Sequence, residues 1–310
     1  MDELYILARR VLLNALDALG EHKHSVVLVG AQAIYVRVGD GDIAAVAPFT
    51  TDGDLALDPR LLKDSPPLET AMLGAAFIKK DVGIWLAREK TKDNVDVDVT
   101  VDLLAPEALS PGTGSRNAGL IGHEAGAARK TPGLECALVD FDVVNLKALE
   151  AIDPRTHDLR AGGPAALLVS KTKKIADRTG TKRLKDKDAL DVLRLLRGTL
   201  TADVAARYRV LLNDAVSKDL AEEALGLLKS QFGERASTGV EMAVRATATL
   251  VDADEIRASC TLLANDLLDA MGRKRAPARA PLSGPLPSPE CLHDGGGIGW
   301  KPADGSGHSR

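Results

Sequence analysis

The sequence has no uninterrupted apolar run of about 18 residues, the length that a membrane-spanning helix requires. It opens on acidic residues, and charged or polar residues interrupt the apolar stretch 6–19. The basic-then-apolar pattern of a secretory leader is therefore also absent. These absences predict a soluble, cytoplasmic protein without a membrane partner.

Cysteine is scarce, and Cys136, Cys260 and Cys291 lie far apart. Their spacing matches neither a zinc site nor a disulfide framework, so we assign no chemistry to them. An excess of positive charge is also missing, because the net charge is −4 and the pI is near 5.9. This balance argues against a globally basic nucleic-acid binder, although such an average can hide a local patch.

Apolar residues make up 45% of the 310 residues, enough for one large core or two moderate ones. We expect two lobes, residues 1–160 containing the strands and residues 161–271 built of helices. Residues 272–310 are rich in Pro, Gly and Ser, which predicts a disordered tail.

The periodicity of apolar residues predicts the individual elements. In the first lobe we expect helices over 2–20, 30–37 and 68–77, and strands over 25–29, 54–57, 83–89, 95–104 and 138–149. The Gly-, Ser- and Ala-rich segment 105–135 is predicted to be an exposed connection, and its His123 receives no role. Further helices are expected over 164–178, from 185 onward, and over 202–212, 218–232, 240–250 and 254–271.

Asp52 and Asp54 enter a predicted strand two positions apart, so their side chains share one face. Such a pair suits Mg²⁺, which usually takes one or two carboxylates and completes its shell with water and substrate phosphates. A later strand carries Asp96, Asp98 and Asp102 on one face. If the two strands are neighbours, the later one supplies a third carboxylate. The alternative is a polar face turned to solvent.

The junction at Gly30 joins a strand directly to a helix and aims backbone N–H groups outward, which suits a phosphate. The loop after this helix contains Gly-Asp-Gly-Asp over 39–42. It lacks the later carboxylates of an EF-hand, so we interpret it as a solvated turn.

Lys171, Lys174 and Arg178 lie on a common face of the helix that begins at Pro164. Three cations in a row need a negative partner or bulk water, and a triphosphate or an RNA backbone would serve. Residues 164–198 contain ten Lys or Arg and four Asp, a local balance of +6 in a chain of net −4. This asymmetry indicates an anionic partner.

Several of these features, taken in chain order, resemble the nucleotidyltransferase superfamily. They are Gly30-Ala31, Thr51 with Asp52 and Asp54 at a strand, the Val-Asp-Leu of 101–103, the Lys-x-x-Lys-x-x-x-Arg of 171–178 and the Lys-Asp-x-x-Asp-x-x-x-Leu-Leu of 187–196. Within the superfamily, this order resembles the AbiEii and MenT type toxins of bacterial toxin–antitoxin systems over residues 25–198. The family commonly has Gly-Ser or Gly-Gly at its first motif. Ala31 lacks the serine hydroxyl that would help to hold a terminal phosphate.

The resemblance implies an α+β fold, with a mixed β-sheet and flanking helices in the N-terminal lobe and a helical bundle in the C-terminal lobe. It also implies roles for the motif residues. Asp52, Asp54 and, as the third carboxylate, Asp102 would hold Mg²⁺ or Mn²⁺ on the phosphates of an NTP. Gly30, Ala31 and Thr51 would contact the nucleotide, Lys171, Lys174 and Arg178 would bind phosphates, and Asp188 would orient or activate the acceptor or support Lys171.

The implied activity is metal-dependent transfer of a nucleoside monophosphate from an NTP to an RNA hydroxyl, above all at a tRNA 3′ end. The protein would then be a toxin, with a separate antitoxin protein as a further partner. Transfer to a small molecule or a protein side chain is an alternative, and so is a catalytically silent nucleotide- or partner-binding module. Charges clustered as densely as these are costly to bury without a ligand, which argues against silence. The local basic patch and the basic residues 273–275 favour a polyanionic acceptor.

Overall fold

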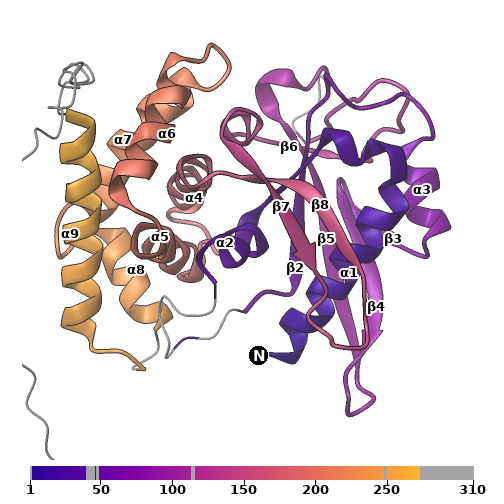
Figure 1. Ribbon diagram of the computed structural model, residues 1–310, viewed down its shortest axis with the longest axis horizontal. Helices are drawn as coiled ribbons and strands as arrows, with labels where there is room; N and C mark the ends of the chain where they lie inside the picture. Colours follow the sequence, from indigo (N-terminus) through magenta and orange to yellow (C-terminus); the bar gives the residue numbers. More distant parts are fainter. Residues whose placement is uncertain (1, 40–45, 47–48, 113–115, 248–249, 273–310) are drawn as a thin grey trace, which may run out of the picture. The chain divides into compact units, whose positions relative to one another are not determined.

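A mixed β-sheet carries the N-terminal part of the chain (Figure 1). The computed structural model describes residues 2–39, 46, 49–112, 116–247 and 250–272. The strands are β1 (Val26–Val29), β2 (Asp52–Leu57), β3 (Ile78–Asp81), β4 (Ile84–Lys90), β5 (Asp96–Pro106), β6 (Arg129–Thr131), β7 (Phe141–Lys147) and β8 (Thr156–Gly162). Their order is β3-β4-β5-β2-β1-β8-β7, and β6 pairs with β5 off this path. The pairs β1–β8, β2–β5 and β5–β6 are parallel and the others antiparallel.

Helices flank this sheet and form the C-terminal region. They are α1 (Glu3–Leu19), α2 (Gly30–Val38), α3 (Leu68–Gly74), α4 (Pro164–Arg178), α5 (Lys187–Gly198), α6 (Thr201–Asn213), α7 (Lys218–Phe232), α8 (Thr238–Ala246) and α9 (Ala253–Gly272). The C-terminal helices pack on one another beside the sheet (Figure 1). The expected α+β class, with a mixed sheet and a helical C-terminal region, is confirmed. Among the described helices, none has the length and apolar character needed to cross a bilayer.

The two faces of the sheet are covered differently. Helix α1 packs on β2, β5 and β8, and Leu12 lies against Gly53 in the middle of β2. Because side chains alternate along a strand, Asp52 and Asp54 project to the opposite face. That face meets α2, through Gly30 and Gln32, and α4. The carboxylates therefore lie between the sheet and the helices α2 and α4.

Three strands are absent from the sequence predictions, namely β3, β6 and β8. The segment 105–135, predicted to be an exposed connection, contains β6 and the buried residues Ala118, Ala127, Ala128 and Leu134. That prediction is wrong because a three-residue strand shows no alternation of its own and is fixed by pairing with β5.

The described residues belong to one compact unit, in which α4 contacts α2 as well as α5, α6 and α7. The division into lobes at residue 160 stays a prediction. The Asp residues of the 39–42 loop, the basic residues 273–275 and the predicted tail from 273 onward lie outside the described residues.

Candidate active site

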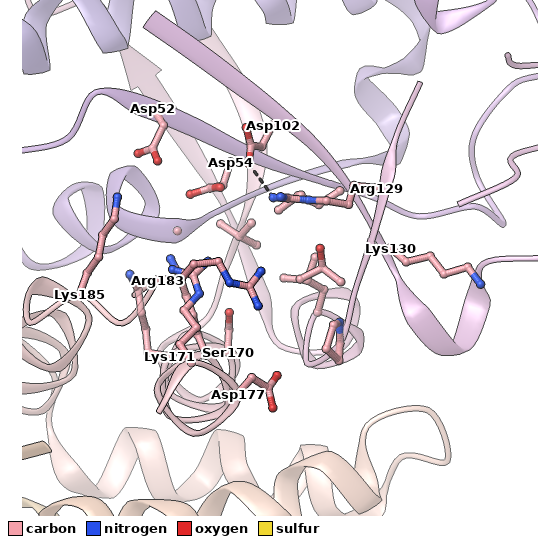
Figure 2. A pocket seen from close by; sticks show the side chains of 18 of the residues that line it. Asp52, Asp54, Asp102, Arg129, Lys130, Ser170, Lys171, Asp177, Arg183 and Lys185 are labelled. Atoms are coloured by element: carbon pink, nitrogen blue, oxygen red, sulfur yellow. Dashed lines mark hydrogen bonds and ion pairs between the residues drawn. The ribbon is translucent and has the colours of Figure 1, made fainter. Parts of the chain in front are cut away.

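A cleft of about 390 Å³ lies between the carboxylate face of the sheet and α4 with its following connection (Figure 2). Its volume is in the range of small-molecule sites. Nine Lys or Arg and four Asp residues line it. The cleft brings together seven of the residues that the sequence singles out, which are Gly30, Asp52, Asp54, Asp102, Lys171, Lys174 and Arg178. Ala31 is buried in α2, Thr51 is exposed beside β2, and Asp188 lies beneath the cleft wall.

The sheet register sets the spacing of the carboxylates. Strand β5 runs parallel to β2 with Asp102 directly beside Asp54, and Asp52 follows on the same face of β2. Asp96 and Asp98 also belong to β5, but both are exposed and pair in register with β4, toward the other end of the strand. Of the three carboxylates on this strand, Asp102 is the one that lines the cleft.

Gly30 makes room for the carboxylate of Asp54. Its φ is +70°, and a Cβ added there would lie 1.9 Å from Oδ2 of Asp54. The register pairs Val29 of β1 with Asp54, so the turn into α2 comes directly over this side chain. A residue other than glycine at this turn would collide with the carboxylate.

The three carboxylates differ in their electrostatic surroundings. Burial, reinforced by the charge of Asp52, raises the pKa of Asp54. Burial also opposes ionisation of Asp52, but the charge of Lys187 and a hydrogen bond from Thr50 Oγ1 outweigh it, and the pKa of Asp52 is lowered. Burial and the charge of Asp54 raise the pKa of Asp102 to about 7, against the opposing charge of Arg129.

Asp102 is held by a cation from β6. The Nη2 atom of Arg129 donates to Oδ2 of Asp102 at 2.7 Å, the contact drawn in Figure 2. The carboxylate of Asp54, by contrast, makes no hydrogen bond or ion pair to any described residue. Sequence analysis missed Arg129 because it lies in the segment predicted to be an unstructured connection.

The cations of α4 converge on one buried carboxylate. Lys171 Nζ lies 2.9 Å from Asp188 and 2.7 Å from Asp191, and all three side chains are almost completely buried. Lys174 and Arg178 reach the same Asp188 at 3.2 and 3.7 Å. Part of the negative charge that this row requires therefore comes from α5. Burial disfavours the Lys171 cation, but Asp191 and Asp188 outweigh that effect and raise its pKa.

Three further cations line the cleft without such partners. Arg183, Lys185 and Lys187 make no side-chain hydrogen bond or ion pair within the part of the chain that the structure describes. Figure 2 shows Lys185 extending toward Asp52. The charge count over 164–198 included these residues but gave none of them a role, since sequence alone does not tell paired from unpaired cations.

Buried polar side chains fix the backbone of Asp52. Gln32 Nε2 donates to the backbone carbonyl of Asp52 at 3.0 Å, and Gln32 accepts in turn from Arg9 Nε at 2.8 Å. Arg9 also donates to the hydroxyl of Tyr5 at 3.0 Å. Hydrogen bonds from α1 and α2 therefore fix the start of β2 where the carboxylates project.

A second buried group lies behind Lys171. Arg194 is 3.6 Å from Asp191 and donates to the hydroxyl of Tyr35 at 3.3 Å. The Tyr35 ring packs edge-on against Tyr5 with centroids 5.5 Å apart. The two buried groups thus meet at these rings, and they connect the carboxylate wall to the cation wall through packed side chains.

Asp52 and Asp54 fit a divalent cation in their chemistry. They are adjacent hard oxygen donors, and the Asp54 carboxylate, which pairs with no described residue, lines a cleft rich in cations. Mg²⁺ and similar ions need only one or two protein carboxylates when substrate phosphates complete the shell. Among the described residues, no group of three or more His, Cys, Asp or Glu is arranged as a metal site. The residues thus fit a two-carboxylate site, while the third carboxylate is engaged by Arg129.

Comparison with known proteins gives little direct guidance. No protein-family model matches the chain, and no curated protein matches it. A similar solved structure is that of an antigenic nucleotidyltransferase-like protein from Paracoccidioides brasiliensis. It is 17% identical over 79% of this chain and 93% of that chain, with a TM-score of 0.43. A function for this protein is therefore best sought in the chemistry of the cleft.

Proposed function

We propose that the protein is a metal-dependent nucleotidyltransferase that transfers a nucleoside monophosphate from an NTP to an RNA hydroxyl. One observation carries this proposal: the carboxylate pair Asp52 and Asp54 shares a cleft with Arg183, Lys185 and Lys187, cations that pair with no side chain among the described residues. Carboxylates beside cations suit a substrate that combines a divalent metal ion with several phosphates.

In the proposed reaction, Asp52 and Asp54 would hold Mg²⁺ or Mn²⁺, which would neutralise charge on the reacting phosphates. Lys174 and Lys187, whose charges act on Asp52, bind the phosphates from the opposite wall. The acceptor hydroxyl attacks the α-phosphorus, a carboxylate accepts its proton, and pyrophosphate leaves. Lys171, held between Asp188 and Asp191, serves as a fixed positive charge, so Asp188 supports this lysine.

The choice of RNA rests on the arrangement of the cations. Arg183 and Lys185 are exposed, and Lys182, the residue before Arg183, is exposed outside the cleft lining. A triphosphate fills a small site, whereas cations that continue outward suit the phosphodiester backbone of a longer acceptor. The AbiEii and MenT resemblance extends the proposal to a tRNA 3′ end, to a growth-arresting toxin and to a separate antitoxin chain.

The direct test is to incubate the protein with Mg²⁺, total RNA and each α-labelled NTP in turn, and to ask where the label goes. We expect labelled RNA, lost with Asp52→Asn and retained with Asp98→Asn, which changes an exposed aspartate outside the cleft. Label on a small molecule or on the protein itself would mean that this molecule, and not RNA, is the acceptor. No label on any acceptor would favour a silent binding module.

The toxin role has a separate test. Expression of the wild-type chain should arrest growth, and Asp52→Asn should relieve the arrest at equal protein level. Arrest that persists with Asp52→Asn would contradict the link between transfer and toxicity.

A further inference from the structure

Strand β6 brings a cation against the carboxylates of the sheet. Arg129 and Asp102 are both largely buried, with side chains 25% and 15% exposed, and their atoms approach to 2.7 Å. The Nε of Arg129 is buried and has no hydrogen-bond partner among the described residues. One donor of the Arg129 side chain is therefore unused while another is bound to Asp102.

The backbone that carries Arg129 is fixed. Leu104 of β5 pairs with Arg129 of β6, and a bridge joins Arg129 to Asn117. Gly83 adopts a φ of +67°, and a Cβ there would lie 2.5 Å from the backbone nitrogen of Arg129. With the backbone held this closely, a change of partner at Arg129 requires only rotation of its long side chain.

The Arg129–Asp102 contact lies within a group of carboxylates. Asp102 lies beside Asp54, and Asp52 is next on the same face, so three carboxylates share this face of the sheet. Arg129 supplies a positive charge to this group. A divalent cation held by the same carboxylates would be repelled by the Arg129 guanidinium, which contacts Asp102 directly. Incoming phosphates, however, offer the guanidinium a new bidentate partner.

We propose that Arg129 is the resident counterion of Asp102 and is exchanged during substrate binding. When the metal ion and the triphosphate enter, Asp102 turns from Arg129 to the metal, and Arg129 turns to the phosphates. Arg129 is thus a positioning residue, and this role rests on the nucleotidyltransferase function proposed above. The exchange makes metal binding weak until a phosphate ligand arrives with it, which ties the third carboxylate to the presence of substrate.

Binding of Mn²⁺ to the full chain without nucleotide tests the first half of the exchange. Free Mn²⁺ is measured by electron paramagnetic resonance at pH 8. We expect Arg129→Gln to bind Mn²⁺ at least tenfold more tightly than the wild type, about 1.4 kcal/mol, because Asp102 is released. The gain should vanish in Arg129→Gln with Asp102→Asn. Arg116→Gln is the matched control, since Arg116 lines the same cleft but pairs with Asp81 at 3.1 Å, and it should bind Mn²⁺ like the wild type.

Binding of inorganic tripolyphosphate in saturating Mn²⁺ tests the second half. Here Arg129→Gln should bind about fivefold more weakly, the opposite direction from Mn²⁺ alone. Arg129→Lys keeps the charge and serves if the glutamine variant does not fold; it should leave Mn²⁺ binding unchanged and weaken tripolyphosphate binding. A residue that only supports the fold would weaken both.

The outcomes separate this inference from the proposed function. If the wild type binds Mn²⁺ and Asp52→Asn does not, but folded Arg129→Gln binds it no more tightly than the wild type, the exchange is wrong and the metal site stands. If neither the wild type nor Asp52→Asn binds Mn²⁺ with or without tripolyphosphate, the metal-dependent function itself fails, and the exchange with it.

Discussion

Gly30 and Asp54 share one small volume: a Cβ on the glycine would lie 1.9 Å from a carboxylate oxygen of the aspartate. The strand-to-helix turn and the second strand are thereby coupled, because the carboxylate occupies the place where the Cβ of any other residue at position 30 would lie. The pairing of Val29 with Asp54 in the β1–β2 register places the turn there. Glycine at this junction thus serves the position of Asp54 as well as the turn itself.

Gly30→Ala should displace Asp54. A displacement of about 1 Å in a catalytic group can cost about 100-fold in rate, and we expect a loss of nucleotide transfer of that order. Strain at positive φ adds a loss of about 1–3 kcal/mol in the free energy of unfolding. Transfer of labelled nucleotide and urea unfolding measure the two effects.

Gly39→Ala is the matched control for this change. Gly39 follows the last residue of the same helix with φ +71°, and a Cβ there would meet no atom of the described residues within 4 Å. It should show the strain of positive φ while keeping transfer activity. Equal activity losses in the two variants would contradict a specific coupling of Gly30 to Asp54.

Lys171→Met should be strongly destabilising. The change leaves Asp188 and Asp191 buried without the ammonium that lies 2.9 and 2.7 Å from them. Breaking a buried ion pair on one side costs about 3–5 kcal/mol of unfolding free energy. Adding Asp191→Asn to Lys171→Met should restore part of this loss, since it removes one of the two buried carboxylates, while Asp188 keeps Lys174 and Arg178 at 3.2 and 3.7 Å.

Lys173→Met is the control on the same helix. Lys173 is partly exposed and pairs with Glu223 and Asp177, contacts worth about 0–1 kcal/mol. Denaturation midpoints of the three variants decide the matter. If Lys171→Met is no less stable than Lys173→Met, Lys171 is not the structural centre of this ion cluster.

The sequence predicts the parts of the site that depend on local periodicity. Alternation along a strand is enough to place Asp52 and Asp54 on one face, and helical spacing is enough to align Lys171 with Lys174. The long amphipathic helices are found for the same reason. These features need no knowledge of which elements become neighbours.

What the sequence does not predict depends on neighbours far apart in the chain. The third carboxylate stays ambiguous in the sequence because only the parallel β2–β5 register sets Asp102 beside Asp54. Arg129 is missed because β6 is three residues long and is defined by its partner strand. Sequence spacing predicts that the α4 cations form a row. It does not predict that Asp188 lies beneath them.

Lys187→Ala should weaken substrate binding without unfolding the protein. Lys187 lines the cleft, and its charge is the strongest cationic influence that lowers the pKa of Asp52. We expect about a tenfold loss in triphosphate affinity, the usual size for a charge-assisted contact, and a change in stability within about 0.5 kcal/mol. Calorimetric titration with tripolyphosphate and Mg²⁺ measures the affinity.

Lys182→Ala provides the comparison for Lys187→Ala, because Lys182 is exposed in the same connection and does not line the cleft. Its triphosphate affinity should match that of the wild type. If both variants lose affinity equally, the effect belongs to the general positive field of the loop and not to a contact in the cleft.

Protonation of His123 should lower the free energy of unfolding in mild acid. Its Nδ1 accepts from the backbone N–H of Leu68 at 3.1 Å, and its ring packs edge-on against His22. Its Nε2 is buried without a hydrogen-bond partner in the described part of the chain. Burial, with the charge of His22, lowers its pKa below the ordinary 6.5. The unfolded chain then binds the proton more readily, so this contribution to stability is complete above about pH 6.5 and declines below it.

The test compares urea unfolding at pH 7.5 and pH 5.5 in the wild type and in His123→Asn, whose amide oxygen can still accept from Leu68. The wild type should lose more stability between these pH values than the variant does, because only the wild type must keep an imidazole uncharged beside His22. His24→Asn changes an exposed histidine and should follow the wild type. Parallel pH dependence in wild type and His123→Asn would mean that this ring is protonated as easily in the folded protein as in the unfolded chain.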